Sequence, residues 1–108
     1  MKVIINRVLP FGKKYHAINI CGVVFAKGPC DAVTLNHEAI HTAQIKELFV
    51  IGFYLWYVLE WVLKALKYRN GYQGYRQISF EREAYSQSKN LNYLKTRKPF
   101  AFIYFQSP

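Results

Sequence analysis

The sequence has few cysteines and few acidic residues, and its first residues do not predict a signal peptide. Cys21 and Cys30 are its two cysteines, and no Cys-x-x-Cys spacing occurs, so a zinc site built from thiolates is not supported. The two thiols can pair across a hairpin or both stay reduced, and the sequence leaves this open. Asn6 and Arg7 interrupt the N-terminal apolar residues before a signal-peptide core can form. We therefore expect a cytoplasmic protein.

No uninterrupted apolar segment reaches the length of a membrane-spanning helix. The longest, residues 48–63, contains Glu60 and is shorter than the ~20 apolar residues that a span needs. We therefore expect a buried core helix in this region. Trp56 and Trp61, followed by basic residues, would also suit a helix lying in a membrane interface, so peripheral membrane contact is the alternative.

Basic residues outnumber acidic ones by 15 to 6, which gives a formal net charge of +9. They occur in short, separated groups, which favours a role in solubility, and no basic recognition helix is present, so nucleic-acid binding is not expected. With 108 residues, 52% hydrophobic and 18% aromatic, residues 1–108 are predicted to form one domain, because a second core would not fit.

The N-terminal third has the pattern of a small β-sheet. Residues 3–5 and 17–26 are rich in β-branched side chains and predict strands, the second with a bend at Gly22. Turns are expected at residues 10–14 and 27–30. A helix should then begin near Asp31 or Thr34, either of which can cap the amides of a first helical turn.

The remainder is predicted to be mainly helical. Residues 35–67 favour two helices, or one long helix kinked near Gly52. We expect a loop over residues 68–74, with left-handed backbone at its glycines, and a helix from Ser79, acting as N-cap, to about residue 94. Residues 100–105 should form a strand or a tail packed on the core. The apolar face expected for the helix after Ser79 consists of Phe80, Ala84, Leu91 and Leu94.

The segment His37-Glu38-Ala39-Ile40-His41 has the spacing of a zinc-peptidase motif. Two histidines four residues apart lie on one face of a helix and can bind one metal ion, and Glu38 is placed to take a proton from water. Catalytic zinc needs a third protein ligand and an open position. The alternative is a pair of surface histidines with an ion-pairing glutamate.

Three glutamates can supply the third ligand. Glu81 opens a predicted helix with a small residue three positions later. Glu60 lies in an apolar stretch and is more simply interpreted as a buried carboxylate paired with Arg69 or Arg76. The side chain of Glu83 should point about 200° around the helix from that of Glu81.

The histidine pair on one helix, followed by a second helix that opens with Glu-x-x-Ala at residues 81–84, resembles the gluzincin class of zinc metallopeptidases. The chain is most similar to the single-domain minigluzincins, and the resemblance covers residues 34–85. It implies that Glu81 is the third zinc ligand. Many relatives carry Asp or Asn four positions after this glutamate; here the residue is Tyr85, whose hydroxyl can serve as the partner of a histidine.

The resemblance also implies an α+β fold in which a small β-sheet, with a hairpin or edge strand, packs on the metal-binding helix and two further helices. In that family an edge strand before the metal helix aligns an extended substrate, which maps onto residues 19–25 here; an ordinary sheet strand is the alternative. Tyr72, Tyr75 and Tyr85 can donate to an oxyanion, and the sequence does not choose among them.

The implied activity is hydrolysis of peptide bonds in a peptide or protein substrate. Zinc would be held by His37, His41 and Glu81, with Glu38 as the general base. Two alternatives remain: a catalytically latent or non-enzymatic zinc-binding module, and a basic membrane-surface protein whose histidine motif is incidental. A groove plugged by residues 95–108 would favour latency.

Overall fold

Three strands and five α-helices form the part of the chain that this computed structural model describes, residues 2–6 and 17–106. The fold is α+β, as predicted. The expected turn at residues 10–14 lies outside the described residues. The elements in chain order are β1 (Lys2–Ile5), β2 (Ala17–Ile20), β3 (Val23–Ala26), α1 (Ala32–Glu47), α2 (Ile51–Tyr68), α3 (Gly71–Arg76), α4 (Ser79–Gln87), α5 (Tyr93–Thr96) and the 3₁₀ helix η1 (Ala101–Phe105).

The sheet has the strand order β1-β3-β2. β1 runs parallel to the central strand β3, with Val3 opposite Val24, and β2 runs antiparallel to it, with Asn19 opposite Val24. The predicted bend at Gly22 is a two-residue hairpin turn: Cys21 and Gly22 both have positive φ, as a type I′ turn requires. Both cysteines are free.

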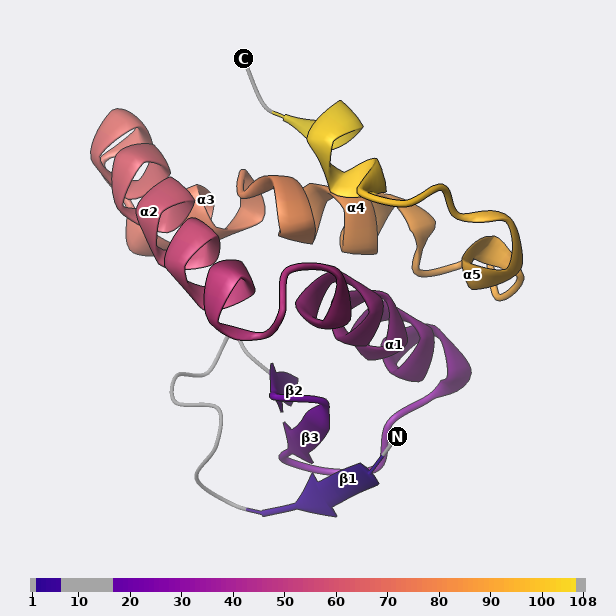
Figure 1. Cartoon of the computed structure of the whole chain (residues 1–108). Helices are drawn as coiled ribbons and strands as arrows, with labels where there is room; N and C mark the ends of the chain where they lie inside the picture. The colour runs from indigo at the N-terminus through magenta and orange to yellow at the C-terminus, as the bar shows by residue number, and fades with distance from the viewer. Residues whose placement is uncertain (1, 7–16, 107–108) are drawn as a thin grey trace.

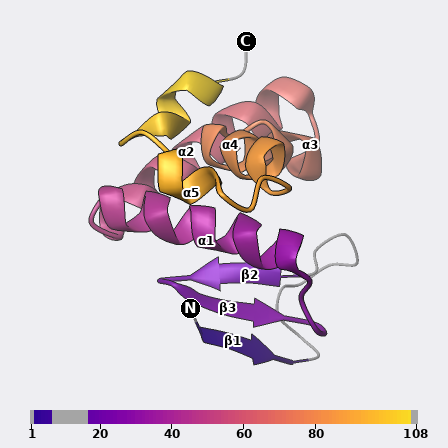
Figure 2. The same cartoon turned by 90° about the vertical axis from the view of Figure 1, so that its right-hand side faces the viewer.

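Helix α1 lies between the sheet and the other helices (Figures 1 and 2). Of the two caps that the sequence allowed, Asp31 is the N-cap, and it accepts a hydrogen bond from the Thr34 amide at 2.8 Å. The main core forms on the other side of α1, where α2, α4 and η1 meet. Its buried side chains are Ile45, Phe53, Ile78, Phe80 and Phe102.

Residues 35–67 form two helices, as predicted, but the break between them lies before Gly52 and not at it. Phe49 and Val50 have φ of 56° and 65°, and α2 begins at Ile51. The prediction of a loop over residues 68–74 is wrong for its second half, because α3 begins at Gly71. The left-handed residue of this connection is Arg69, and neither glycine has positive φ.

The helix predicted from Ser79 to residue 94 ends at Gln87, and α5 is a separate short helix. Phe80 and Ala84 are buried as expected, but Leu91 is 56% exposed and Leu94 38% exposed, because they follow the end of α4. Ser79 is not the N-cap: Ile78 takes that position, and Ser79 is the first helical residue. Residues 101–105 form η1, which packs Phe102 into the core.

Helix α2 is not the buried core helix that the sequence predicted. Only Phe53 and Glu60 are buried among its residues, and most of its aliphatic side chains are exposed. In the described part of the chain no single helix is long and apolar enough to cross a membrane. The pair α1 and α2 passes such a test together, with a bend of 113° between them.

Candidate metal centre

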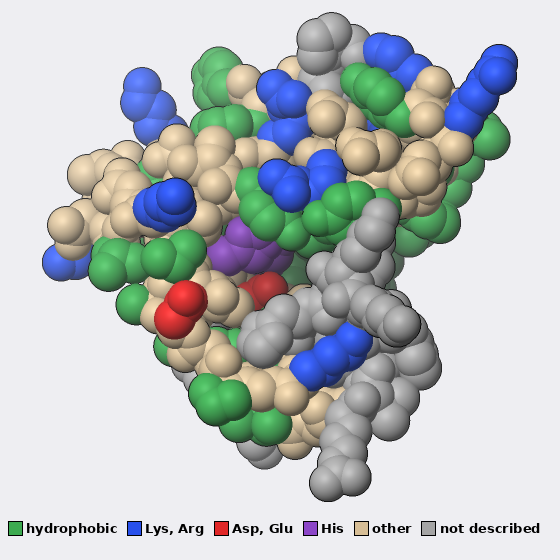
Figure 3. Space-filling model, turned by 180° about the vertical axis from the view of Figure 1, so that it is seen from behind, with side chains coloured by type: hydrophobic (Ala, Val, Ile, Leu, Met, Phe, Trp, Pro, Cys, Tyr) green, Lys and Arg blue, Asp and Glu red, His purple; other side chains and the backbone are tan. Residues whose placement is uncertain are grey.

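Helix α1 places the side chains of His37 and His41 side by side on its inner face. Both residues are almost fully buried, at 9% and 5% exposure, and their Nε2 atoms lie 3.1 Å apart. Figure 3 shows the histidine side chains in a hollow between the helices and the sheet, with an acidic side chain nearby. The helix is therefore turned so that both imidazoles face one point.

Glu81 reaches the same point from the first turn of α4. Its Oε1 atom lies 2.9 Å from His41 Nε2 and 3.3 Å from His37 Nε2. The amino-terminal end of a helix favours a negative charge, which suits a carboxylate at this position. The three residues are buried and form the group in the described chain that can hold a metal ion.

The two other glutamates considered as third ligands lie elsewhere. Glu60 is buried and accepts hydrogen bonds from the backbone and hydroxyl of Ser79 and from Trp56 Nε1, not from an arginine as the sequence suggested. Glu83 points to the opposite side of α4, as its angular spacing predicted, where it binds Arg97.

The contacts of Gln44 determine that His41 carries a proton on Nδ1, the ring nitrogen that faces away from Glu81. The Gln44 amide nitrogen donates to the carbonyl of Phe80 at 3.1 Å and to Glu83 Oε1 at 2.9 Å. Its carbonyl oxygen is therefore the atom that lies 2.8 Å from His41 Nδ1, and that nitrogen must donate. Nε2 is then the nitrogen that would give up its proton and bind a metal ion, as the second ring nitrogen of metal-binding histidines does.

Tyr57 holds the second oxygen of Glu81. Its hydroxyl donates to Glu81 Oε2 at 2.7 Å, while Oε1 faces the two histidines. The Tyr57 ring stacks on Phe80 in the core, so the hydroxyl position is set by packing. Burial and the adjacent Glu81 carboxylate both raise the pKa of Tyr57, so the hydroxyl remains a donor.

The ionisation of the cluster follows from its burial and close contacts. Burial disfavours charge on His41, but the Glu81 carboxylate outweighs this and raises the pKa of His41 to about 9. Burial likewise opposes charge on Glu81, and the two histidines nevertheless hold its pKa well below the usual range. In the absence of a metal ion the centre is therefore a buried ion pair.

Glu38 is buried next to this cluster, with one oxygen lacking a partner. It is 5% exposed, and among the described residues its Oε2 is the buried side-chain atom without a hydrogen bond. Burial is the main cause that raises the pKa of Glu38, partly offset by His41 and His37. A buried carboxylate oxygen without a partner is costly, which makes Glu38 a candidate for a functional position.

Tyrosines form the wall beside His37. The Tyr85 ring packs on the His37 ring with centroids 4.4 Å apart, and its hydroxyl lies 2.7 Å from that of Tyr75. Tyr85 thus contacts His37 through its ring and not through the hydroxyl, which the sequence analysis had allowed as the partner of a histidine. Burial and the charge of Glu81 raise the pKa of Tyr75, which keeps that hydroxyl protonated.

The hairpin is joined to the metal helix by Asn19. Its Nδ2 donates to the Glu38 carbonyl at 2.9 Å and to the Thr42 hydroxyl at 2.8 Å. Of the expected substrate strand over residues 19–25, only the part in β2 is an edge of the sheet, because β3 is central. β2 is the strand nearest α1 (Figure 2).

The sequence analysis placed His37, His41 and Glu81 together but missed the residues that hold them. Gln44 lies three residues after His41, so helical spacing was a signal that could have revealed it. Tyr57 and Asn19 are distant in sequence and carried no such signal. Comparison of the chain with models of known protein families, with curated proteins and with solved structures found no match.

Proposed function

We propose that this chain is a zinc-dependent metallopeptidase of the gluzincin type, similar to the minigluzincins. The triangle of His37 Nε2, His41 Nε2 and Glu81 Oε1, with sides of 2.9 to 3.3 Å, is the observation that supports it. Ligands at zinc's usual bond length of ~2.05 Å in a tetrahedral array lie about 3.3 Å apart. The spacing and the donor types therefore fit zinc with one position left for water or substrate.

The reaction assigned to the site is hydrolysis of a peptide bond. When bound, zinc supplies a Lewis acid that acidifies water and polarises a carbonyl. Glu38 accepts the proton of the attacking water and delivers it to the departing amine. Its raised pKa suits this role, because a base with a pKa nearer neutrality can both accept and return a proton.

The expected substrate is an extended peptide segment of a peptide or protein. In the described sheet the edge of β2 away from β3 pairs with no other strand, and β2 lies next to α1. A strand edge that pairs with no other strand can bind an extended chain through backbone hydrogen bonds; at Asn19 the substrate would displace the Tyr54 hydroxyl, which lies 3.4 Å from the Asn19 carbonyl. Asn19 sets the distance between this edge and the Glu38 backbone.

A catalytically latent zinc protein is the second function to test, because all three ligand residues are less than 10% exposed. A groove plugged by residues 95–108 would have favoured latency, but η1 within that range lies on the far side of α4 from α1 (Figures 1 and 2). Access to the centre therefore depends on the hollow seen in Figure 3 rather than on release of η1.

The Glu38→Gln variant tests the proposal. It should retain stoichiometric zinc, measured by metal analysis, and lose hydrolysis of a panel of fluorogenic peptides by at least ~10²-fold, because general-base catalysis is removed. Glu47→Gln is the matched control, since Glu47 is on the same helix but contacts Arg97 instead; it should keep both zinc and activity.

Undiminished hydrolysis by Glu38→Gln would exclude the general-base role. Zinc binding without hydrolysis by the unmodified protein would favour latency, and a protein that binds no zinc would refute both assignments.

A further inference from the structure

One side of α2 is covered with exposed aliphatic side chains. They recur every three or four residues, so they lie on one side of the helix. The opposite side carries Phe53 and Glu60, which are buried against the rest of the chain. The exposed stripe consists of Ile51 (72% exposed), Leu55 (70%), Val58 (55%), Leu59 (61%), Val62 (41%), Leu63 (57%) and Leu66 (72%).

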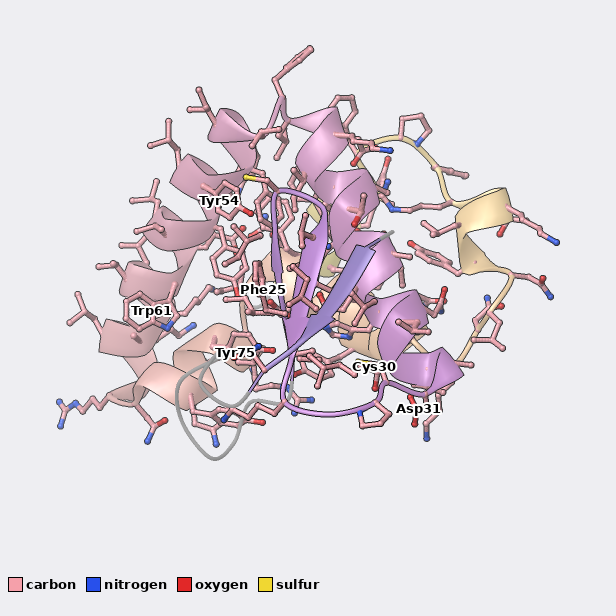
Figure 4. All side chains as sticks on the ribbon, turned by 90° about the horizontal axis from the view of Figure 1, so that it is seen from below. Phe25, Cys30, Asp31, Tyr54, Trp61 and Tyr75 are labelled. Atoms are coloured by element: carbon pink, nitrogen blue, oxygen red, sulfur yellow. The ribbon has the colours of Figure 1, made fainter. Side chains whose placement is uncertain are left out.

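No element of the described chain covers this aliphatic stripe. The side chains on the outer side of α2 project away from the other helices and the sheet (Figure 4). Phe49, directly before α2, is 89% exposed and extends the apolar surface. A contiguous apolar surface on this scale marks an interaction site, because scattered single apolar residues are the normal case on protein surfaces.

The charges of the molecule favour an anionic partner. Four of the six acidic residues in the chain are buried: Glu38, Glu60, Glu81 and Glu83. Glu47 is paired with Arg97, and Asp31 caps α1. Among the described residues, Asp31 is therefore the one exposed acidic residue, whereas seven basic residues are exposed: Lys46, Lys67, Arg69, Arg76, Lys89, Lys95 and Lys98.

Basic residues also lie at both ends of the aliphatic stripe. At one end, Lys46 is exposed in the last turn of α1, and its carbonyl accepts a hydrogen bond from the amide of Phe49, which places it next to the stripe. At the other end, Lys67 and Arg69 are exposed where α2 ends. α2 itself has a single acidic residue, the buried Glu60. An apolar side with cations at its ends is the pattern of a helix that lies in the interface of an anionic membrane.

We propose that α2 docks this aliphatic stripe into the surface of a membrane that contains anionic phospholipids. The helix lies on the membrane instead of crossing it, since no single described helix is long and apolar enough to span, and α1 buries the histidines and Glu38. A second copy of the chain is disfavoured as the occupant, because two copies would each bring a net charge of +9. The docking is independent of the peptidase activity.

Co-sedimentation with lipid vesicles tests this docking without any need for zinc or activity. The full chain should bind phosphatidylcholine vesicles that contain phosphatidylglycerol, and bind pure phosphatidylcholine vesicles much more weakly. The triple variant Leu55→Ser, Leu59→Ser and Leu66→Ser should bind these vesicles with more than about ten-fold lower affinity, because each change removes apolar area that would insert into the membrane. Raising the salt concentration should weaken binding of the unmodified chain.

A second triple variant, which removes exposed apolar side chains outside α2, is the matched control. Ile5, Leu91 and Ile103 are 59%, 56% and 49% exposed and lie outside α2, so their replacement by Ser should leave vesicle binding unchanged. Circular dichroism of both variants checks that helix content is retained.

Three results would overturn the proposal: no binding of the unmodified chain to anionic vesicles, equal binding to neutral and anionic vesicles, or unchanged binding of the α2 variant. A dimer in analytical ultracentrifugation that the α2 variant abolishes, without vesicle binding by the unmodified chain, would assign the stripe to self-association instead.

Discussion

Glu81 uses its two carboxylate oxygens for different purposes. Oε1 faces the histidines, and Oε2 accepts the Tyr57 hydroxyl at 2.7 Å. Groups that orient a metal ligand are commonly worth 10- to 100-fold in metal affinity. The Tyr57 hydroxyl therefore orients a candidate metal ligand through Oε2, the oxygen that does not face the histidines.

The Tyr57→Phe variant should lower zinc affinity about 10- to 100-fold while the fold is retained. The ring that packs on Phe53 and Phe80 remains, and only the hydroxyl is removed. Competition for zinc with a chromophoric chelator measures the change.

Tyr54→Phe provides the comparison for this prediction. Tyr54 is on the same helix, but its hydroxyl accepts from the Cys21 amide at 2.8 Å and contacts no residue of the metal cluster. Its removal should leave zinc affinity unchanged. Equal effects of the two variants would show that the loss at Tyr57 is a general consequence of altered packing.

The sequence predicts the candidate metal ligands better than it predicts the residues that orient those ligands. His37 and His41 lie four apart on one helix, so local geometry alone joins them. Glu81 needed the resemblance to a known class as well, because its distance from the histidines depends on how α1 and α4 pack. The contact of Tyr57 with Glu81 depends on the packing of α2 against α4, which no local pattern specifies.

At the level of elements, α3 packs closely against α2 at Gly74. A Cβ atom added there would lie 2.5 Å from the backbone nitrogen of Ala65, in α2. This distance is shorter than real Cβ contacts, and a backbone atom cannot move aside as a side chain can. The glycine is therefore required by the packing of the two helices and not by its backbone conformation.

Gly74→Ala should destabilise the protein by about 1–3 kcal/mol, because α3 must move away from α2. Gly52→Ala should instead be neutral or stabilise by up to about 1 kcal/mol, since Gly52 is helical and its added Cβ would meet Leu48 at an ordinary 3.5 Å. Chemical denaturation measures both. A destabilisation of similar size in the two variants would contradict the close approach at Gly74.

The helix boundaries that the sequence missed have a common physical origin. Phe49 and Val50 adopt positive φ between α1 and α2, although such residues rarely do so. The low helix propensity of glycine predicts a helix break at Gly52. In the folded chain the break between α1 and α2 lies three residues earlier, at Phe49. The existence and type of α1, α2 and α4 followed from local patterns; the ends of these helices depended on contacts between them.

At the scale of the whole molecule, buried polar contacts join the helices around the centre. Arg97, which follows α5, binds Glu83 of α4 and Glu47 of α1. Gln44 connects α1 to α4, and the His41–Glu81 contact does the same at the centre. A metal ion bound there would tie α1 to α4, and since this geometry exists only in the folded chain, its binding energy would add to stability.

Zinc removal should therefore lower the thermal midpoint of unfolding. At free zinc of about 100 times the dissociation constant, a single site adds about 2.7 kcal/mol. For a domain of this size, that corresponds to a rise of about 10–20 °C over the chelated protein. Differential scanning calorimetry with zinc and with a chelator measures this difference.

The Glu81→Gln variant separates binding at this centre from zinc bound elsewhere on the chain. It replaces the carboxylate with a neutral amide of the same shape. Without the Glu81 charge, burial lowers the pKa of His41, so the neutral imidazole leaves no unpaired charge and the metal-free fold should survive. Its midpoint should respond little to zinc, because a ligand is missing. Glu60→Gln, which alters a buried glutamate bonded to Ser79 instead, should keep the full response to zinc. A full zinc-dependent shift in Glu81→Gln, lost in Glu60→Gln, would move the metal site from the histidine cluster to Glu60.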